Sequence, residues 1–275
     1  MKRNKSDITL LHTELRSSDL KEKLEYHYRL YDRSNIAPDP LQYPHRYSAP
    51  ADIELIAFLA SVYAFGNVKQ ISAVMDKMLK KLGSAPAENL RTMSELSVLN
   101  EFSGIVHRFY SGDDTARLML VLRSILHHHG SIAGLVKSLL PQGQTPVPGS
   151  VISLFHHFFV TELLTSGAVT NGLRFMIPKP SSGSSCKRFN LFLRWMVRRD
   201  ELDFGLWDFI SPSDLIIPVD THIAQIARKL GLTSRKQGDW KMAEEITARL
   251  REFDPADPVK YDFSLCHIGI RGLEF

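Results

Sequence analysis

The stretch Ile217-Pro218-Val219-Asp220-Thr221-His222-Ile223-Ala224-Gln225-Ile226-Ala227-Arg228-Lys229-Leu230-Gly231 predicts a helix that begins directly after an aspartate. Its apolar residues follow the helical period better than strand alternation, and a glycine closes the run. Asp220 therefore falls at the helix N-terminus, where aspartate is a preferred cap. Capping alone would explain this residue, so its position does not by itself indicate a functional site.

An amine, Lys187, lies 33 residues upstream of this carboxylate. An amine and a carboxylate together can cut a bond at a sugar carbon. The amine attacks that carbon, and the carboxylate stabilises the positive charge that builds on the sugar. The plain alternative makes Lys187 a surface residue near the start of a helix.

Two motifs resemble the helix-hairpin-helix DNA glycosylases, the superfamily of endonuclease III and the adenine glycosylases. Residues 217–231 are similar to the P-V-D-T-H segment of that superfamily. GSSCKRFNLFLRWM, residues 183–196, is similar to the hairpin that precedes its catalytic lysine. Gly183 falls on the first hairpin glycine and Lys187 on the lysine, while Ser185 replaces the second hairpin glycine.

Weaker likenesses extend the resemblance over most of the chain. Residues 52–71 are similar to the early helix that carries intercalating residues, and residues 260–270 to the late helix of the adenine glycosylases. Residues 198–216 lengthen the usual interval between the lysine and the aspartate, as in the archaeal 8-oxoguanine glycosylases. The overall likeness is to a bacterial family within this superfamily.

The resemblance implies an all-α fold of two helical lobes, of the HhH-GPD DNA glycosylase type. One lobe would comprise residues 51–199 with the hairpin, and the other residues 1–50 plus 200–275. The catalytic pair would then face each other across a cleft. The four-cysteine iron–sulfur motif of endonuclease III is missing, so we expect no cluster, no other cofactor and no metal. The chain contains only two cysteines, Cys186 and Cys266, too few for a disulfide framework or a cysteine-built metal site.

Periodicity also predicts helices nearly throughout, with no strand pattern long enough for a sheet. Gly66-Asn67 could divide one long helical stretch, and the Pro-rich residues 35–50 and 141–149 predict irregular connectors. The expected helices lie at Leu10 to Tyr31, Ala51 to Leu82, Ser94 to Phe102, Ala116 to His128, Ser131 to Leu140 and Val151 to Ser166.

The composition fits a cytoplasmic globular protein, which we expect to be a monomer. Hydrophobic residues make up 44% and charged residues 23% of the chain, values that are ordinary for a soluble domain. The N-terminus lacks a secretory signal, and the longest apolar run, residues 55–65, is too short to cross a membrane. The net charge is +4, and residues 171–236 hold 11 Lys and Arg against 6 Asp and Glu. This local excess predicts either a phosphate-binding surface or a solvated basic face.

A lysine that attacks a sugar carbon must be neutral, whereas free lysine has a pKa of about 10.4. We expect burial, the helix dipole and neighbouring Arg188 and Arg194 to lower the pKa of Lys187. Asp220 should stay ionised at its own helix N-terminus.

The hairpin is expected to hold DNA phosphate through the helix N-terminus and its flanking residues, namely Gly183, Ser184, Ser185 and Arg188. Alternatively, Ser184 or Ser185 only caps the helix. Extraction of a base from a duplex also requires a wedge and a stacking pocket. Candidates for the wedge or pocket are Tyr63, Phe65, Asn67, Trp195, Trp207 and Asp262, although each aromatic also fits a core position and Asp262 a structural role.

The leading hypothesis is a DNA glycosylase of base-excision repair that acts on a damaged base in double-stranded DNA. Abasic-site lyase activity is left open, and the long lysine–aspartate interval favours an oxidised purine by analogy. One alternative is a catalytically silent DNA- or RNA-binding protein of the same fold. Another is a metal-dependent hydrolase built on histidines 127–129 and 156–157, but these lack the spacing of a known zinc motif.

Overall fold

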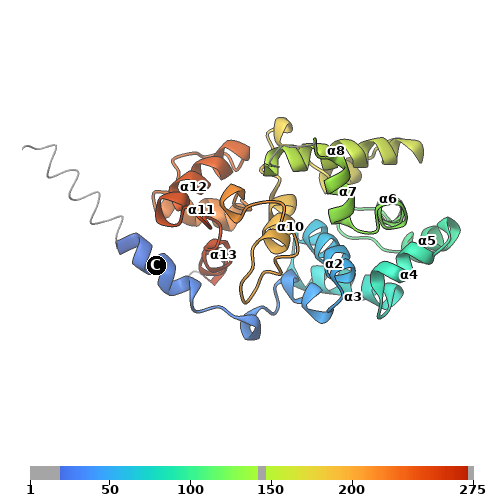
Figure 1. Ribbon diagram of the computed structural model, residues 1–275, viewed down its shortest axis with the longest axis horizontal. Coiled ribbons are helices and arrows are strands. Elements are labelled where there is room, and N and C mark those ends of the chain that lie inside the picture. Colours follow the sequence, from blue (N-terminus) through green and yellow to red (C-terminus); the bar gives the residue numbers. More distant parts are fainter. Residues whose placement is uncertain (1–18, 142–146, 272–275) are drawn as a thin grey trace, which may run out of the picture.

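The structure is a computed structural model that describes residues 19–141 and 147–271, and helices dominate both ranges (Figure 1). No strand forms within these ranges, which contain only two isolated bridges, His107–Tyr110 and Arg199–Phe204. The prediction of an all-α protein is confirmed at this level. The helices are α2 Pro50–Tyr63, α3 Val68–Leu82, α4 Pro86–Thr92, α5 Glu95–Phe102, α6 Gly112–His129, α7 Ile132–Leu139, α8 Pro148–Thr165, α9 Asn171–Met176, α10 Lys187–Val197, α11 Thr221–Lys229, α12 Trp240–Phe253 and α13 Asp262–Arg271.

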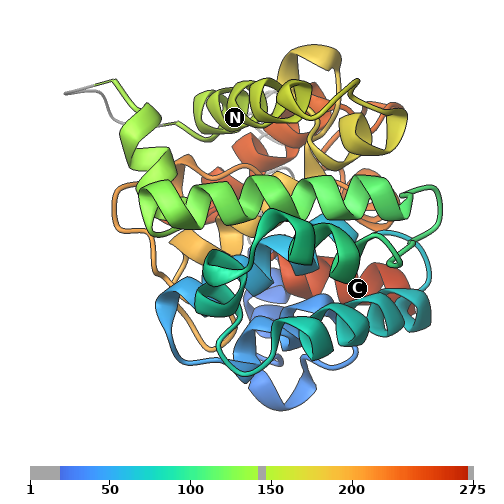
Figure 2. The same ribbon diagram turned by 90° about the vertical axis from the view of Figure 1, so that its right-hand side faces the viewer.

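The helices form two groups on either side of α10. Figure 1 shows α2 to α8 on one side and α11 to α13 on the other. The view in Figure 2 shows α6, in green, running across one face of the first group. None of the described helices combines the length and the apolar character needed to cross a membrane.

Most of the predicted helices are present, and their ends follow local signals. Gly66, with a φ of 96°, separates α2 from α3, and the Asn67 side chain accepts a hydrogen bond from the Lys69 amide at 2.8 Å. The break predicted at Gly66-Asn67 is therefore confirmed. Residues 19–28 of the predicted first helix are helical, and its earlier part lies outside the described residues. The short helices α4 and α9, and the longer α12, were not predicted.

The core is built around α2, whose side chains are buried on nearly every face. Such a helix needs partners on all sides, and α10 packs directly against it. Phe58 of α2 lies 5.4 Å from Phe192 of α10 and 5.5 Å from Phe155 of α8, measured between ring centroids. This packing fixes α10, the helix that begins with Lys187.

A buried arginine–aspartate network joins the end of α10 to the turn after it and to α13. Its cations, Arg194 and Arg198, are 2% and 3% exposed, and its carboxylates are Asp200, Asp203, Asp257 and Asp262. Arg194 lies 3.1 Å from Asp203 and 2.5 Å from Asp262. Arg198 pairs with Asp203 and lies 2.8 Å from both Asp200 and Asp257. The lengthened interval after Lys187 thus supplies two carboxylates, those of Asp200 and Asp203. They neutralise Arg194 of α10 and Arg198, which directly follows α10.

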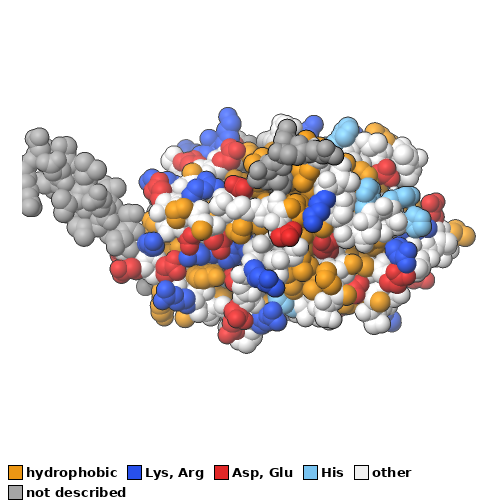
Figure 3. Space-filling view, viewed as in Figure 1, with side chains coloured by type: hydrophobic (Ala, Val, Ile, Leu, Met, Phe, Trp, Pro, Cys, Tyr) orange, Lys and Arg blue, Asp and Glu red, His pale blue; other side chains and the backbone are white. Residues whose placement is uncertain are grey.

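This network leaves the basic excess of residues 171–236 unchanged, because it buries two arginines and two aspartates of that range. Two of the arginines counted there are neutralised inside the protein and add nothing to its surface charge. Figure 3 shows acidic and basic side chains interspersed over one face of the molecule.

Candidate functional site

A pocket of about 630 Å³ lies where the turn after α2, the start of α10, and helices α11 and α13 meet. Its volume is within the range of small-molecule sites. Both chemical candidates, Lys187 and Asp220, line it, together with Phe65, Phe175 and Phe263. The pocket therefore combines an ion pair with aromatic walls.

The lysine and the aspartate meet as predicted from the resemblance. Lys187 Nζ lies 3.3 Å from Asp220 Oδ2, and the two side chains are 30% and 19% exposed. Lys187 Nζ also donates a hydrogen bond to the Ala64 carbonyl oxygen at 3.4 Å. Asp220 caps α11, because its Oδ1 accepts from the Ile223 amide at 2.9 Å. Capping and ion pairing use different oxygens of Asp220, so both roles hold at once.

The charge state of Lys187 differs from the expectation. Burial would lower the pKa of the Lys187 ammonium, but Asp220, Cys266 and Asp39 outweigh it and raise that pKa above the usual value. The charge of Arg194, which was expected to lower this pKa, is matched by the carboxylates of the buried network. The prediction that the surroundings lower the pKa of Lys187 is therefore wrong, because the nearby carboxylates favour its ammonium form.

Asp220 is ionised, as expected. Burial would raise the pKa of its carboxyl, but Lys187 and the Ile223 amide bring the pKa below its ordinary value. The site at rest is therefore a partly buried ion pair.

The hairpin that precedes Lys187 is tied to the residue that precedes Asp220. Ser185 Oγ donates to the Val219 carbonyl oxygen at 3.0 Å, and the Asn190 side-chain amide donates to the Ser185 carbonyl oxygen at 3.0 Å. Ser185 replaces a glycine of the hairpin motif that the sequence resembles, and a glycine could not make the first of these bonds. The Ser185 hydroxyl thus ties the hairpin before Lys187 to the segment before Asp220, which helps to keep the amine close to the carboxylate.

Neither hairpin serine caps α10. The residue before the helix, Cys186, has a φ of 48° and no side-chain cap bond. Ser184 Oγ accepts from the Cys186 amide at 3.1 Å, ahead of the helix. The capping alternative is therefore wrong for both serines. Gly183 is exposed and has a φ of 78°, in the left-handed region that favours glycine.

Arg188, expected at a phosphate, turns into the protein. It is 8% exposed, its Nη2 donates to the Phe175 carbonyl oxygen, and it lines the pocket. Of the four residues expected to bind phosphate, Ser184, Ser185 and Arg188 therefore line the pocket, whereas Gly183 lies outside its lining.

Of the residues expected in a wedge or base pocket, Phe65 and Asp262 line the pocket. Asn67 is exposed and caps α3. Tyr63 is fully buried, and its hydroxyl shares a hydrogen bond of 2.9 Å with Thr115. Asp262 is 3% exposed and bound to Arg194, and burial raises the pKa of its carboxyl to about 6 despite that arginine. This partner favours the structural role for Asp262.

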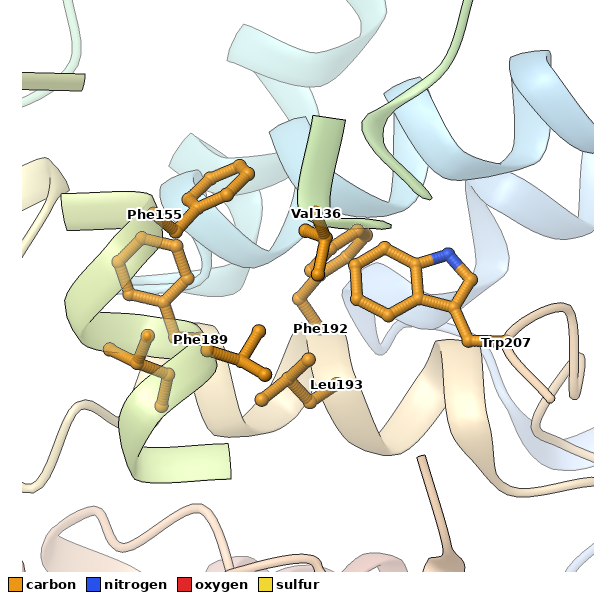
Figure 4. A pocket seen from close by; sticks show the side chains of 8 residues that line it. Val136, Phe155, Phe189, Phe192, Leu193 and Trp207 are labelled. Carbon is orange, nitrogen blue, oxygen red and sulfur yellow. The ribbon is translucent and has the colours of Figure 1, made fainter. Parts of the chain in front are cut away.

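Trp195 and Trp207 both belong to the core, which corrects their expected role in stacking. Trp195 is 0% exposed and Trp207 is 1% exposed. The Trp207 indole N–H donates to Glu54 Oε1 at 2.7 Å, and its ring meets Phe192 edge to face at 5.3 Å. Figure 4 shows Trp207 beside Val136 and Phe192 around an apolar cavity of about 10 Å³. That volume is about one water probe, so the cavity is a packing void and cannot hold a base.

Several pocket residues were not singled out from the sequence. Residues 38–40 come from the Pro-rich connector, and Phe175 and Phe263 supply aromatic surface. Cys266 also lines the pocket, and burial together with Asp220 and Asp262 raises the pKa of its thiol well above the ordinary value. The only signal in the sequence for these residues is that they lie in the connector or the late-helix motif, or a few residues before the hairpin.

The histidine tract does not form a metal site. The rings of His127 and His128 meet edge to face at 4.9 Å, and His129 contacts Phe158. Across residues 19–141 and 147–271, no group of three His, Cys, Asp or Glu side chains is placed to hold a metal ion.

Comparison with known families assigns most of the chain. Residues 39–271 match the model of the family described as "Protein of unknown function (DUF2400)". No curated protein and no solved structure matches the chain. Because the matched range covers most of the sequence, the chain belongs to the DUF2400 family.

Proposed function

We propose that this member of the DUF2400 family is a DNA glycosylase that removes a damaged base from double-stranded DNA. The observation that carries the proposal is the Lys187–Asp220 pair, held at 3.3 Å inside a pocket of about 630 Å³. Aromatic side chains on the pocket wall suit a base turned out of the duplex. An oxidised purine is the favoured substrate class.

In the proposed reaction, Lys187 first gives a proton to water, and its neutral Nζ then forms a bond to the sugar C1′ while the bond from C1′ to the base breaks. The electron pair of the broken bond leaves with the base, which takes up a proton from water. The Asp220 carboxylate stabilises the positive charge on the sugar while this bond breaks. The nitrogen bound to C1′ then gives a proton to water, and the C1′–O4′ bond breaks as O4′ takes up a proton, which leaves a protonated imine between Nζ and C1′. Loss of a C2′ proton from the imine expels the 3′ phosphate, which is the lyase step.

The raised pKa of Lys187 predicts a pH dependence. The attacking amine must be neutral, and below its pKa the neutral fraction grows about tenfold for each pH unit. We expect the single-turnover rate of strand cleavage to rise with this slope between about pH 6 and 9. The rate of Lys187→Gln at each pH supplies the background to subtract. A flat profile would show that the proton passes directly to Asp220 and that solution pH does not control the amine.

A panel of duplexes, each with one lesion or an abasic site, tests the function itself. We expect cleavage of at least one lesion duplex and a borohydride-trapped protein–DNA adduct on the abasic duplex. Duplex affinity should fall as salt rises, because bound phosphates release counterions. Fluorescence anisotropy that detects no duplex binding at low salt would rule out the proposed function.

A further inference from the structure

Four arginine side chains are buried within the described residues, and Arg188 differs from the other three. Arg194 and Arg198 are matched by carboxylates. Arg117 donates to the Leu163, Gly167 and Ala168 carbonyl oxygens and to the Ser166 hydroxyl, at 2.6 to 3.0 Å. These three guanidiniums are therefore satisfied by the protein itself.

Arg188 has no such set of partners. Within residues 19–141 and 147–271 its side chain makes one hydrogen bond, from Nη2 to the Phe175 carbonyl oxygen. No carboxylate of these residues forms an ion pair with it. Its Nε is buried without an acceptor. Burial lowers the pKa of the Arg188 guanidinium below its usual value. An unmatched buried cation costs free energy, so its retention needs a reason.

The surroundings of Arg188 indicate what it can bind. It lines the same pocket as Lys187, and its Cζ lies 3.9 Å from the centroid of the Phe175 ring and 5.7 Å from that of Phe65. A guanidinium offers five donors and no acceptor. The neighbouring rings offer a flat apolar surface to a planar ligand and no donor to a phosphate.

We propose that Arg188 is a specificity-determining residue of this pocket, and that its guanidinium donates hydrogen bonds to a carbonyl oxygen on the edge of the bound base. This inference rests on the proposed function. It selects bases that carry such an oxygen, among them guanine and 8-oxoguanine, over adenine. Adenine carries an amino group at the position of this oxygen. An amino group is itself a donor, so it would leave the Arg188 guanidinium without an acceptor. The oxygens of a DNA phosphate accept the same hydrogen bonds, so a phosphate is the alternative ligand of Arg188.

Nucleoside binding to the full chain tests this inference without requiring cleavage. The probes are 8-oxo-2′-deoxyguanosine, 2′-deoxyguanosine, 2′-deoxyadenosine and inorganic phosphate, each titrated by calorimetry. We expect the wild-type protein to bind the two guanine-type nucleosides about 10- to 100-fold more tightly than deoxyadenosine. Arg188→Met should remove this preference. Arg188→Lys keeps the charge but loses the planar guanidinium. This variant should therefore keep only part of the preference for the guanine-type nucleosides.

Thermal unfolding separates this role from a structural one. Arg188→Met removes an unmatched charge and should leave Tm within about 2 °C of wild type or above it. Arg117→Met is the matched control, because it leaves several buried carbonyl oxygens without a donor. It should lower Tm by about 5 °C or more. An equal fall in both variants would make Arg188 a structural cation and overturn the inference.

The remaining outcomes separate the inference from the proposed function. If phosphate binds and Arg188→Met weakens all ligands and duplexes equally, the arginine holds phosphate and the base-reading role is wrong. If lesion duplexes are cleaved but Arg188→Met keeps the same lesion preference, this inference falls and the glycosylase proposal stands. If Arg188 distinguishes the nucleosides but no duplex is cleaved, this inference stands and the glycosylase proposal falls. If wild type binds no nucleoside and cleaves no duplex, both fall.

Discussion

Lys187→Gln is expected to abolish the borohydride-trapped adduct on abasic and lesion duplexes, because glutamine has no amine that can form an imine. Abasic DNA reacts slowly with many amines, so an adduct counts only if it depends on Lys187. The variant should still bind duplex DNA, since only one charge in the pocket is lost. An adduct of undiminished yield in Lys187→Gln would remove the lysine from the chemistry.

Asp220→Asn separates the charge of that side chain from its capping role. Asparagine keeps the size and can still accept the Ile223 amide bond, which is 2.9 Å long in the wild type. We expect turnover on a cleaved lesion duplex to fall by about 10²- to 10³-fold with little change in duplex affinity. The transition state alone carries the developing positive charge, which explains this division. Full activity would leave Asp220 as a helix cap.

Asp203→Ala should cause the largest loss of stability. Asp203 has no exposed side-chain surface and pairs with both Arg194 and Arg198. Its removal leaves Nε and Nη2 of Arg194 and Nη1 of Arg198 buried without the carboxylate that accepts from them, and breaking buried pairs of this kind costs about 3–5 kcal/mol. Because a natural domain is stable by only about 5–15 kcal/mol, the variant should be partly unfolded or unfold at much lower urea.

The matched control is Asp208→Ala in the same interval. Asp208 is 90% exposed and lies 3.8 Å from Lys137, and an exposed pair of this kind contributes at most about 1 kcal/mol. Urea denaturation followed by circular dichroism measures both variants. A loss in Asp203→Ala no greater than that in Asp208→Ala would show that the network adds no stability.

The elements that sequence predicted well are those fixed by local signals. Asp220 caps a helix and Gly66 ends one, and both effects involve only neighbouring residues. The approach of Lys187 to Asp220 was expected from the resemblance, but the bond from Ser185 to Val219 that supports it joins segments far apart in the chain. No local pattern reveals such a bond.

The errors concern environment more than element type. Trp195 and Trp207 were plausible pocket residues, but a sequence does not show which face of a helix or turn meets the core. The pKa shift of Lys187 was predicted in the wrong direction, because the groups that raise this pKa, Asp220, Cys266 and Asp39, come from distant parts of the chain. Arg188 was assigned to phosphate because its neighbours in sequence lie on an exposed hairpin, whereas its side chain turns inward.

The pairing of residues far apart in the chain has a consequence for biosynthesis. The Tyr261 hydroxyl donates to Glu25 at 2.6 Å across 236 residues of sequence, and Lys260 lies 2.8 Å from the same carboxylate. At about 5–20 residues per second, a ribosome makes Glu25 about 10 to 50 s before these partners. The helix at residues 19–28 must therefore wait for the segment that leads into α13, and its docking belongs to a late stage of folding.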